Sequence, residues 1–180
     1  MSEKNKSLFY TNDINLLNTN QEGYAFGNSL AVLYDDVKTV GFFAELKADL
    51  SNEITLGING NFDSYSTNNQ SEAWHLPSLR VNLFADVMIN EKWNAGASIF
   101  YVGERKALSN FVDTFGDAEA RVFNLDGYFD ANLYVNYKYT DRWTFFGKLN
   151  NIANQDYQKF LNYPVQGIQV MVGANYKFDF

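Results

Sequence analysis

Side chains of alternating character run through most of this sequence with a period of two residues. In the last stretch, Gln166–Phe180, one parity carries mainly Ile, Val, Ala and aromatic residues, and the other carries Gly, Gln, Asn, Lys and Asp. Successive side chains of a β-strand point to opposite faces, so this stretch predicts a strand with one apolar and one mostly polar face. No stretch has convincing helical periodicity, and the sequence therefore predicts an all-β fold.

Eight stretches show the alternation: 28–36, 40–50, 54–65, 79–90, 93–102, 128–139, 143–150 and 166–180. Three connections are tight polar turns within a crude repeat, SNEITLG, NEKWNAG and TDRWTFFG. The others are longer polar segments at 66–76, 104–123 and 153–164. Tight turns at one end and long loops at the other are typical of an antiparallel up-and-down sheet. We expect residues 1–27 to be a polar segment or outer loop, and residues 28–180 to hold the strands.

The apolar parity is almost free of charge over several strands, whereas the other parity carries Glu45, Lys47, Arg80, Asp86 and Lys148 among others. Aromatic residues, 17% of the chain, gather at strand ends beside the tight turns and at the C-terminus. Amphipathic rings settle where hydrocarbon meets lipid headgroups. We therefore expect an interfacial girdle made of Trp93, Tyr139, Trp143, Tyr176, Phe178 and Phe180.

These features predict an antiparallel up-and-down transmembrane β-barrel of about eight strands, either a small closed barrel or a segment of a larger one. A soluble β-sandwich also alternates, but its apolar face lies inward. The two readings differ in one observable. Lipid exposure of Leu83, Leu133 and Val170 supports the barrel, and their burial in one dry interior supports the sandwich.

The layout also predicts which end of the barrel faces outward. Short turns of outer-membrane barrels lie in the periplasm, so the three long segments are expected outside. The last strand then ends at the periplasmic rim, where a terminal strand ending in Phe resembles the signal read by the outer-membrane assembly machinery. The expected partners are outer-membrane lipid, lipopolysaccharide and this machinery.

Composition excludes several classes of function. The formal net charge is −7 and no basic patch stands out, which argues against a nucleic-acid partner. Cysteine is absent, so no disulfide framework or thiolate metal site is possible. The N-terminal MSEKNKSLFYTND lacks the apolar region and cleavage site of a secretory signal. We expect a protein that stays inside the cell, a mature form, or a fragment.

Several motifs resemble the carboxyl end of a TonB-dependent outer-membrane receptor of the Bacteroidetes sort. They are LNNIANQDYQ after an upward strand, YPVQGIQ entering the last strand, and the terminal YKF. The segments VLYDDVKTVGFFAEL and AWHLPSLRVNLFADVMINEKWNAGASIFYVGERK resemble the preceding strands of such receptors. The resemblance implies import of a scarce nutrient, such as an iron chelate, cobalamin or a glycan, through a barrel of about 22 strands closed by a plug.

The sequence departs from the family pattern because no signal, TonB-contacting segment or plug precedes the strands. We therefore expect either a C-terminal fragment or a small protein derived from one, in which TonB acts only through a plug that is absent here. The alternatives are a free-standing eight-stranded structural or adhesive barrel and a small barrel enzyme that uses His75, the only histidine.

Candidate site residues lie mainly on the expected outer side. A receptor could stack a sugar or siderophore on Trp74, Tyr101, Phe111, Phe115, Tyr157 and Tyr163. His75 has no clear catalytic partner, so we expect no enzyme activity. The acidic groups Asp35-Asp36 and DTFGDAEA offer oxygen ligands for Ca²⁺, but DTFGDAEA lacks the spacing of a calcium loop. We expect both groups to be solvated loops, without metal or cofactor. Arg105, Lys106 and Arg121 either meet lipopolysaccharide phosphates or are simply solvated.

Overall fold

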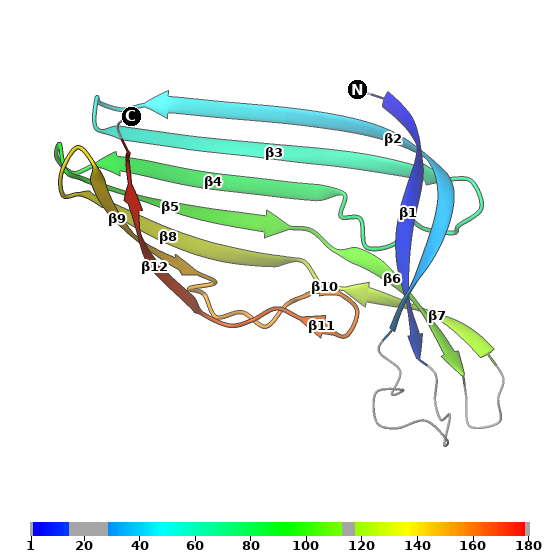
Figure 1. The fold of residues 1–180 in the computed structure, drawn as a ribbon. Coiled ribbons are helices and arrows are strands. Elements are labelled where there is room, and N and C mark those ends of the chain that lie inside the picture. Colours follow the sequence, from blue (N-terminus) through cyan, green and yellow to red (C-terminus); the bar gives the residue numbers. More distant parts are fainter. Residues whose placement is uncertain (1, 15–28, 113–117, 179–180) are drawn as a thin grey trace, which may run out of the picture.

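The computed structural model describes residues 2–14, 29–112 and 118–178, and these residues contain strands but no helix. Ten strands form one large sheet, and two short ones form a small hairpin (Figure 1). The strands are β1 (Ser2–Ile14), β2 (Ser29–Asp49), β3 (Ile54–Thr67), β4 (Leu79–Met88), β5 (Trp93–Val102), β6 (Arg105–Val112), β7 (Ala118–Leu125), β8 (Tyr128–Lys138), β9 (Trp143–Asn150), β10 (Gln158–Phe160), β11 (Tyr163–Pro164) and β12 (Gln169–Tyr176). The described residues include no helix long and apolar enough to span a membrane.

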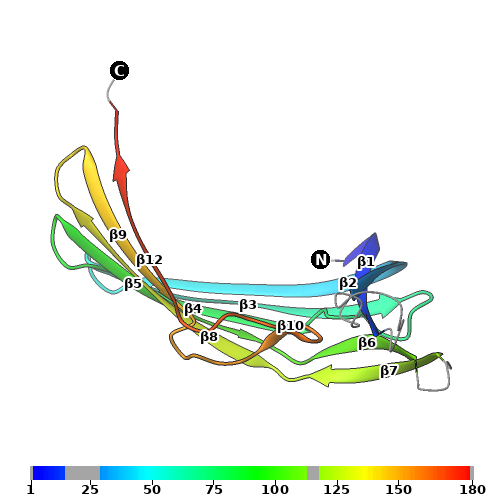
Figure 2. The same cartoon turned by 60° about the horizontal axis from the view of Figure 1, so that its bottom comes forward.

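The large sheet is open and strongly bent, like a trough seen from its end (Figure 2). Its order is β12-β9-β8-β5-β4-β3-β2-β1-β6-β7, and β1 and β6 are its parallel pair. The other pairs are antiparallel, and consecutive strands joined by tight turns are neighbours. The predicted antiparallel, up-and-down sheet is confirmed, as a sheet that does not close on itself.

The strand content differs from the prediction in four places, one of which is the expected loop 153–164, where β10 and β11 form a short hairpin. The expected strands 28–36 and 40–50 are one strand of 21 residues, β2, which is about 70 Å long at 3.3 Å per residue. Residues 2–14, expected to be part of a polar segment or outer loop, form strand β1, which pairs with the N-terminal half of β2, residues 29–40. The expected loop 104–123 contains the hairpin β6–β7. The sequence of β6 lacks the alternation that predicts a strand, because its buried side carries Ala107 and Ser109, which do not form a recognisable apolar face.

The crude sequence repeat corresponds to three turns of the same construction. Ser51, Asn90 and Thr140 open the turns, and their side-chain oxygens accept hydrogen bonds from backbone N–H groups two or three residues later. The backbone carbonyl three residues further on, in Ile54, Trp93 or Trp143, accepts a bond that closes the turn. Local side-chain acceptors of this kind are the reason Ser, Thr and Asn favour turns.

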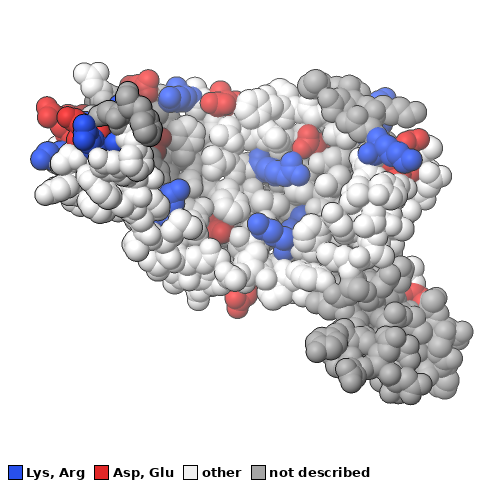
Figure 3. Space-filling view, in the orientation of Figure 1, with Lys and Arg blue, Asp and Glu red and all other residues white. Residues whose placement is uncertain are grey.

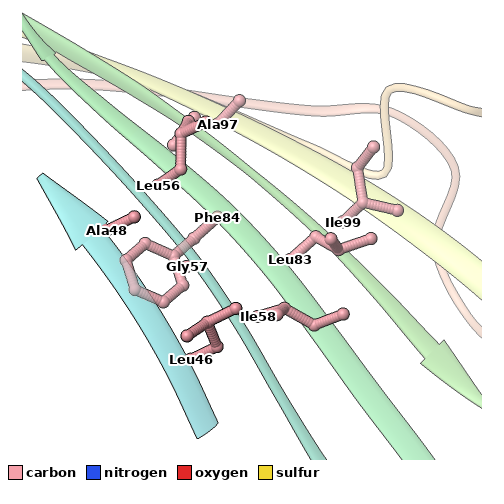
Figure 4. A pocket seen from close by; sticks show the side chains of 10 residues that line it. Leu46, Ala48, Leu56, Gly57, Ile58, Leu83, Phe84, Ala97 and Ile99 are labelled. Carbon is pink, nitrogen blue, oxygen red and sulfur yellow. The ribbon is translucent and has the colours of Figure 1, made fainter. Parts of the chain in front are cut away.

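The two faces of the sheet differ as the alternation predicted. Leu83 is 47% exposed, Leu133 40% and Val170 70%, so the apolar face is not the inside of a sandwich. This face holds a shallow apolar hollow of about 410 Å³ across β2 to β5, with Leu46, Ile58 and Leu83 around it (Figure 4). On the face drawn in Figure 3, basic and acidic side chains lie across the hollowed middle of the sheet.

Glycine and aromatic residues alternate across neighbouring strands on the polar face. Gly57 lies opposite Phe84, Gly96 opposite Tyr134, and Gly173 opposite Phe146. A Cβ at Gly57 would lie 2.1 Å from the Phe84 ring, so this ring occupies the space that a side chain would take. Covering strand glycines with aromatic rings compensates for their missing packing.

Candidate functional site at the loop end

The ends of the strands away from the tight turns carry an interlocked set of segments, which we call the loop-end cluster. It consists of loop 68–78, the hairpin β6–β7, segment 151–168 with β10 and β11, and the packed parts of β1 and β2. The loop-end cluster packs against the N-terminal part of β2, residues 29–40, which pairs with β1.

The carboxylate of Asp35 fastens loop 68–78 to β2. It accepts hydrogen bonds from the backbone N–H groups of Asn68, Asn69 and Gln70, and from the side-chain amide of Asn69, at 2.8–3.1 Å. Its exposed fraction is 2%, so the expectation of a solvated acidic loop is wrong for this residue. Burial alone would raise the pKa of Asp35, but the bonds from Gln70, Asn69 and Asp36 lower it to about 2.

A small hydrophobic core lies beneath this fastened loop. Trp74, with 2% exposure, packs with Phe9 of β1 and Val37 of β2, and Leu33 and Leu108 surround them. The indole N–H of Trp74 donates to the Gln70 side chain at 2.9 Å. The Asp35 bonds and the Trp74 core therefore hold the same loop from its two sides.

His75 lies where three segments meet. Its backbone N–H donates to the carbonyl of Lys106 in β6 at 2.7 Å, and its Nε2 accepts from the N–H of Leu161 at 3.5 Å. The imidazole is 8% exposed and lies beside the Phe160 ring, with 5.1 Å between the ring centroids. Its φ is 62°, an uncommon conformation for a residue other than glycine.

A second group of buried polar side chains surrounds Arg105. The guanidinium lies over the Tyr128 ring at 4.8 Å and donates to the carbonyls of Asp126 and Lys159 at 3.3 Å. The ring of Tyr128 also stacks on the ring of Tyr157, with centroids 3.8 Å apart. The hydroxyl of Tyr157 donates a hydrogen bond to Asp130 at 2.8 Å. Burial and the Asp130 bond both raise the pKa of Tyr157. This group ties β6 and β8 to segment 151–168.

Asn151 explains one of the motifs quoted above, LNNIANQDYQ. It is buried with φ of 50°, and its side chain bonds the backbone of Gln155 in both directions and the carbonyl of Gln166. The side chain thereby closes both ends of segment 151–166 at the outer end of β9. Asn tolerates positive φ better than most residues, which suits it to this position.

Two polar cavities flank Arg105. One, of about 610 Å³, lies between loop 68–78 and the start of β6, with Asp63, Tyr65, Glu72 and Tyr101 among its lining residues. The other, of about 590 Å³, is lined by the β7 end, Tyr128 and segment 155–158. Both cavities lie at the end of the molecule that was expected to face outward.

The predicted ligand-contacting aromatics do not form one surface. Trp74 belongs to the buried core and Tyr157 to the Tyr128 stack. Tyr101 is exposed and borders the larger cavity, and Tyr163 is partly exposed in β11. Phe111 lies in β6, where its side chain is outside the described part of the structure, and Phe115 lies outside the described residues altogether.

The residues predicted as a girdle lie at the tight-turn end. Trp93, Tyr139, Trp143, Tyr176 and Phe178 are exposed, and Phe180 lies outside the described residues. Their rings contact one another across strands, from Trp93–Tyr137 through Trp143–Tyr176 to Tyr176–Phe178, at 4.4, 4.8 and 4.7 Å. The rings thus form a continuous row on the apolar face.

The basic residues considered for lipopolysaccharide binding are buried or paired with acidic side chains. Arg105 is buried, Lys106 pairs with Glu72, and Arg121 pairs with Glu119. Asp113 and Asp117 lie outside the described residues. No group of three or more potential metal ligands occurs among the residues that the structure describes. Sequence reasoning missed the roles of Asp35, Arg105 and Asp130, because each depends on partners 20 or more positions away.

Comparison with known proteins shows what this fold is similar to. No sequence model of a protein family matches the chain, and no curated protein matches it. Solved structures do match. The ferripyoverdine receptor of the outer membrane of Pseudomonas aeruginosa aligns over 98% of this chain and 24% of its own, with a TM-score of 0.64 and 16% identity. The siderophore receptor PirA from Acinetobacter baumannii aligns over 99% and 26%, with a TM-score of 0.64 and 15% identity.

The ferric-catecholate import receptor Fiu from E. coli also aligns, over 84% of this chain and 22% of its own, with a TM-score of 0.62 and 15% identity. These neighbours are TonB-dependent outer-membrane receptors. The fold is that of an outer-membrane β-barrel segment. The barrel segment spans about a quarter of the length of these receptors.

Proposed function

We propose that this chain is the carboxyl-terminal part of the barrel of a TonB-dependent receptor, of the Bacteroidetes type, in a Gram-negative outer membrane. The complete receptor would import a scarce nutrient such as an iron chelate, cobalamin or a glycan. The observation that carries the proposal is the exposed apolar face with Leu83, Leu133 and Val170, on a sheet that aligns almost end to end with receptor barrels.

The sheet edges support a segment of a larger barrel. β12 pairs only with β9, and β1 pairs with β2 no further than Val40, so among the described strands residues 41–49 of β2 pair only with β3. Unpaired backbone groups cost several kcal/mol each in hydrocarbon. We infer that other strands of a receptor barrel satisfy both edges in the membrane.

The loop-end cluster is the proposed ligand side. Tyr101 and Tyr163 are accessible rings that could stack on a nutrient, and Trp74 and Tyr157 would position the loops around them. Phe111 and Phe115 remain proposed contacts. The aromatic row at the other end would lie at the periplasmic headgroups, and the carboxyl-terminal strand would be read by the assembly machinery.

Lipopolysaccharide is a proposed partner of the outer rim. The proposed membrane crossing of β2 is residues 40–49, since a strand crosses a membrane in about 9–11 residues. Lys38 is exposed on the apolar parity of β2 just before this crossing, and Lys6 is exposed on the neighbouring strand β1. Cations at this height could bind the phosphates of lipopolysaccharide. TonB would act on this protein only through a plug region.

The enzyme alternative has little support. Among the described residues no serine hydroxyl or carboxylate is hydrogen-bonded to His75, whose Nε2 faces the N–H of Leu161 instead. The structural neighbours are transport receptors. A free-standing adhesive barrel remains the second candidate, and it requires the two edges of the sheet to pair with each other.

Spin labels test the orientation of the sheet. The chain has no cysteine, so single Cys substitutions at Leu83 and at the adjacent Asn82 report one face each. In outer-membrane vesicles we expect the label at position 83 to be accessible to apolar oxygen and the label at 82 to a water-soluble nickel chelate. Equal accessibility to both reagents at both positions would contradict a lipid-facing apolar band.

Nutrient uptake tests the receptor function separately. Deletion of the gene in its own bacterium should abolish growth on one scarce nutrient from a panel of iron chelates, cobalamin and glycans, and deletion of TonB should reproduce the defect. Normal growth on the whole panel, with the label result intact, would favour the structural or adhesive barrel.

A further inference from the structure

His75 lies where loop 68–78, β6 and segment 151–168 meet. Its backbone is held by Lys106, while its ring reaches the backbone of Leu161, 86 residues away. Phe160 beside it packs edge-on against Tyr10 of β1, with ring centroids 5.5 Å apart. Four separate parts of the chain thus meet around a single imidazole, the only one in the sequence.

In this geometry the neutral ring makes the favourable contact. A neutral imidazole carries one acceptor nitrogen and one N–H, and here Nε2 faces a backbone N–H. An imidazolium would present a donor to this donor. It would also place a second positive charge in a buried site, because Arg105 lies close enough to act on it.

The other charged groups around the ring do not offset that charge. Lys106 in β6 is paired with Glu72 of the loop, so this carboxylate is already engaged. Segment 151–168 brings Lys159 and β1 brings Tyr10, and neither of these side chains is a carboxylate. Burial is the largest influence and lowers the pKa of His75. The Tyr10 backbone comes next and raises it, and the charge of Arg105 lowers it again.

We propose that His75 is a pH-sensitive fastener of the loop-end cluster, which holds segment 159–163 against loop 68–78 when neutral and releases it when protonated. The proposal does not require that the barrel segment transport a ligand. Because the pKa of His75 in the folded protein lies below the ordinary value of 6.5, the stabilisation is fully present above pH 6.5 and is lost as the pH falls below it.

Two measurements on the full chain in lipid vesicles test this fastener. Because the chain has one histidine, its imidazole gives one NMR titration curve, and we expect a midpoint below 6.5. Spin labels at Ser66→Cys and Lys159→Cys, both exposed, report the separation of β3 and segment 151–168. We expect one narrow distance distribution near pH 7.5 and a broad, longer one near pH 5.

The matched variant is His75→Asn, which tolerates positive φ but does not titrate. With it, the distance distribution should be the same at both pH values, whatever its width. A label pair within β3 and β4, Ser66→Cys with Leu79→Cys, should not respond to pH. A pH response that persists in His75→Asn, a midpoint above 6.5, or no response in the unsubstituted chain would overturn the proposal.

Discussion

The membrane-crossing sheet and the loop-end cluster are built from the same strands, yet they bury their side chains in opposite ways. The buried hydrophobic residues of the described chain lie in the cluster, as Phe9, Val37, Trp74, Ala107, Leu125 and Leu161 do, or at the adjoining start of β8, as Tyr128 does. The middle of the sheet leaves Leu46, Leu83 and Val172 exposed. Lipid replaces the apolar core along the crossing, whereas the part that meets water must supply its own core.

The largest expected effect separates two tryptophans that differ in solvent. Trp74→Ala should destabilise the loop-end cluster by about 3–5 kcal/mol, because it leaves a cavity in a small core. The matched variant Trp93→Ala removes an exposed ring that stacks on Tyr137, worth about 0.5–1.5 kcal/mol. Both losses of stability are measured by denaturant unfolding in lipid vesicles, with cleavage of loop 68–78 by a protease as the readout. Equal losses would erase the contrast between the two regions.

A charge on the apolar face gives the next largest effect. Leu83→Arg should cost about 2–4 kcal/mol, since position 83 lies in the middle of a crossing strand and faces hydrocarbon. The control Asn82→Arg places the same side chain on the opposite face and should change stability little. Reversible unfolding from vesicles measures the difference. A larger cost at position 82 would mean that the faces have been assigned the wrong way round.

Glycine substitutions test packing on the polar face of the crossing. Gly57→Ala should cost about 1–3 kcal/mol, because its Cβ would lie 2.1 Å from the Phe84 ring, which must move. At Gly147, which lies on the apolar face of β9, a Cβ would lie 3.5 Å from Val135, an ordinary contact, and Gly147→Ala should be nearly neutral. If Gly57→Ala is also neutral, Phe84 is free to turn into an open lumen.

The smallest expected effect is the acid response of the Asp35 fastening. Its pKa of about 2 lies below the ordinary value of 3.8, so its contribution is present above pH 3.8 and is lost as the pH falls through about 2. Asp35→Asn should remove this response and expose loop 68–78 to hydrogen exchange at neutral pH. Asp36→Asn, at an exposed neighbour, is the control. Unchanged protection in Asp35→Asn would show that the Trp74 core holds the loop alone.

Much of the sheet followed from the sequence because lipid imposes a simple local pattern. Strands β3, β4, β5, β8, β9 and β12, the three repeated turns and the exposed face of Leu83 were all predicted from residue parity and turn chemistry. Strand β6 escaped this reasoning, because its buried positions hold Arg105, Ala107 and Ser109. Such a strand is stabilised by the segments that pack on it, and the alternation of residues along one strand carries no information about those segments.

The candidate site was less predictable for the same reason. Residue type alone suggested that Trp74 was a ligand platform and Asp35 a solvated acid, but the structure buries both, with partners on other segments. His75 was recognised as a lone loop histidine, and its position at a junction depends on Lys106 and Leu161.

By itself, then, the sequence determined that this chain is a β-sheet with one face for hydrocarbon and one for a polar interior, because alternation is a property of each strand alone. Only the tertiary structure decided that the sheet stays open and that the loops at one end of it pack together around Asp35, Trp74 and His75. Those contacts join residues far apart in the chain, and their energies depend on burial that no single segment can create.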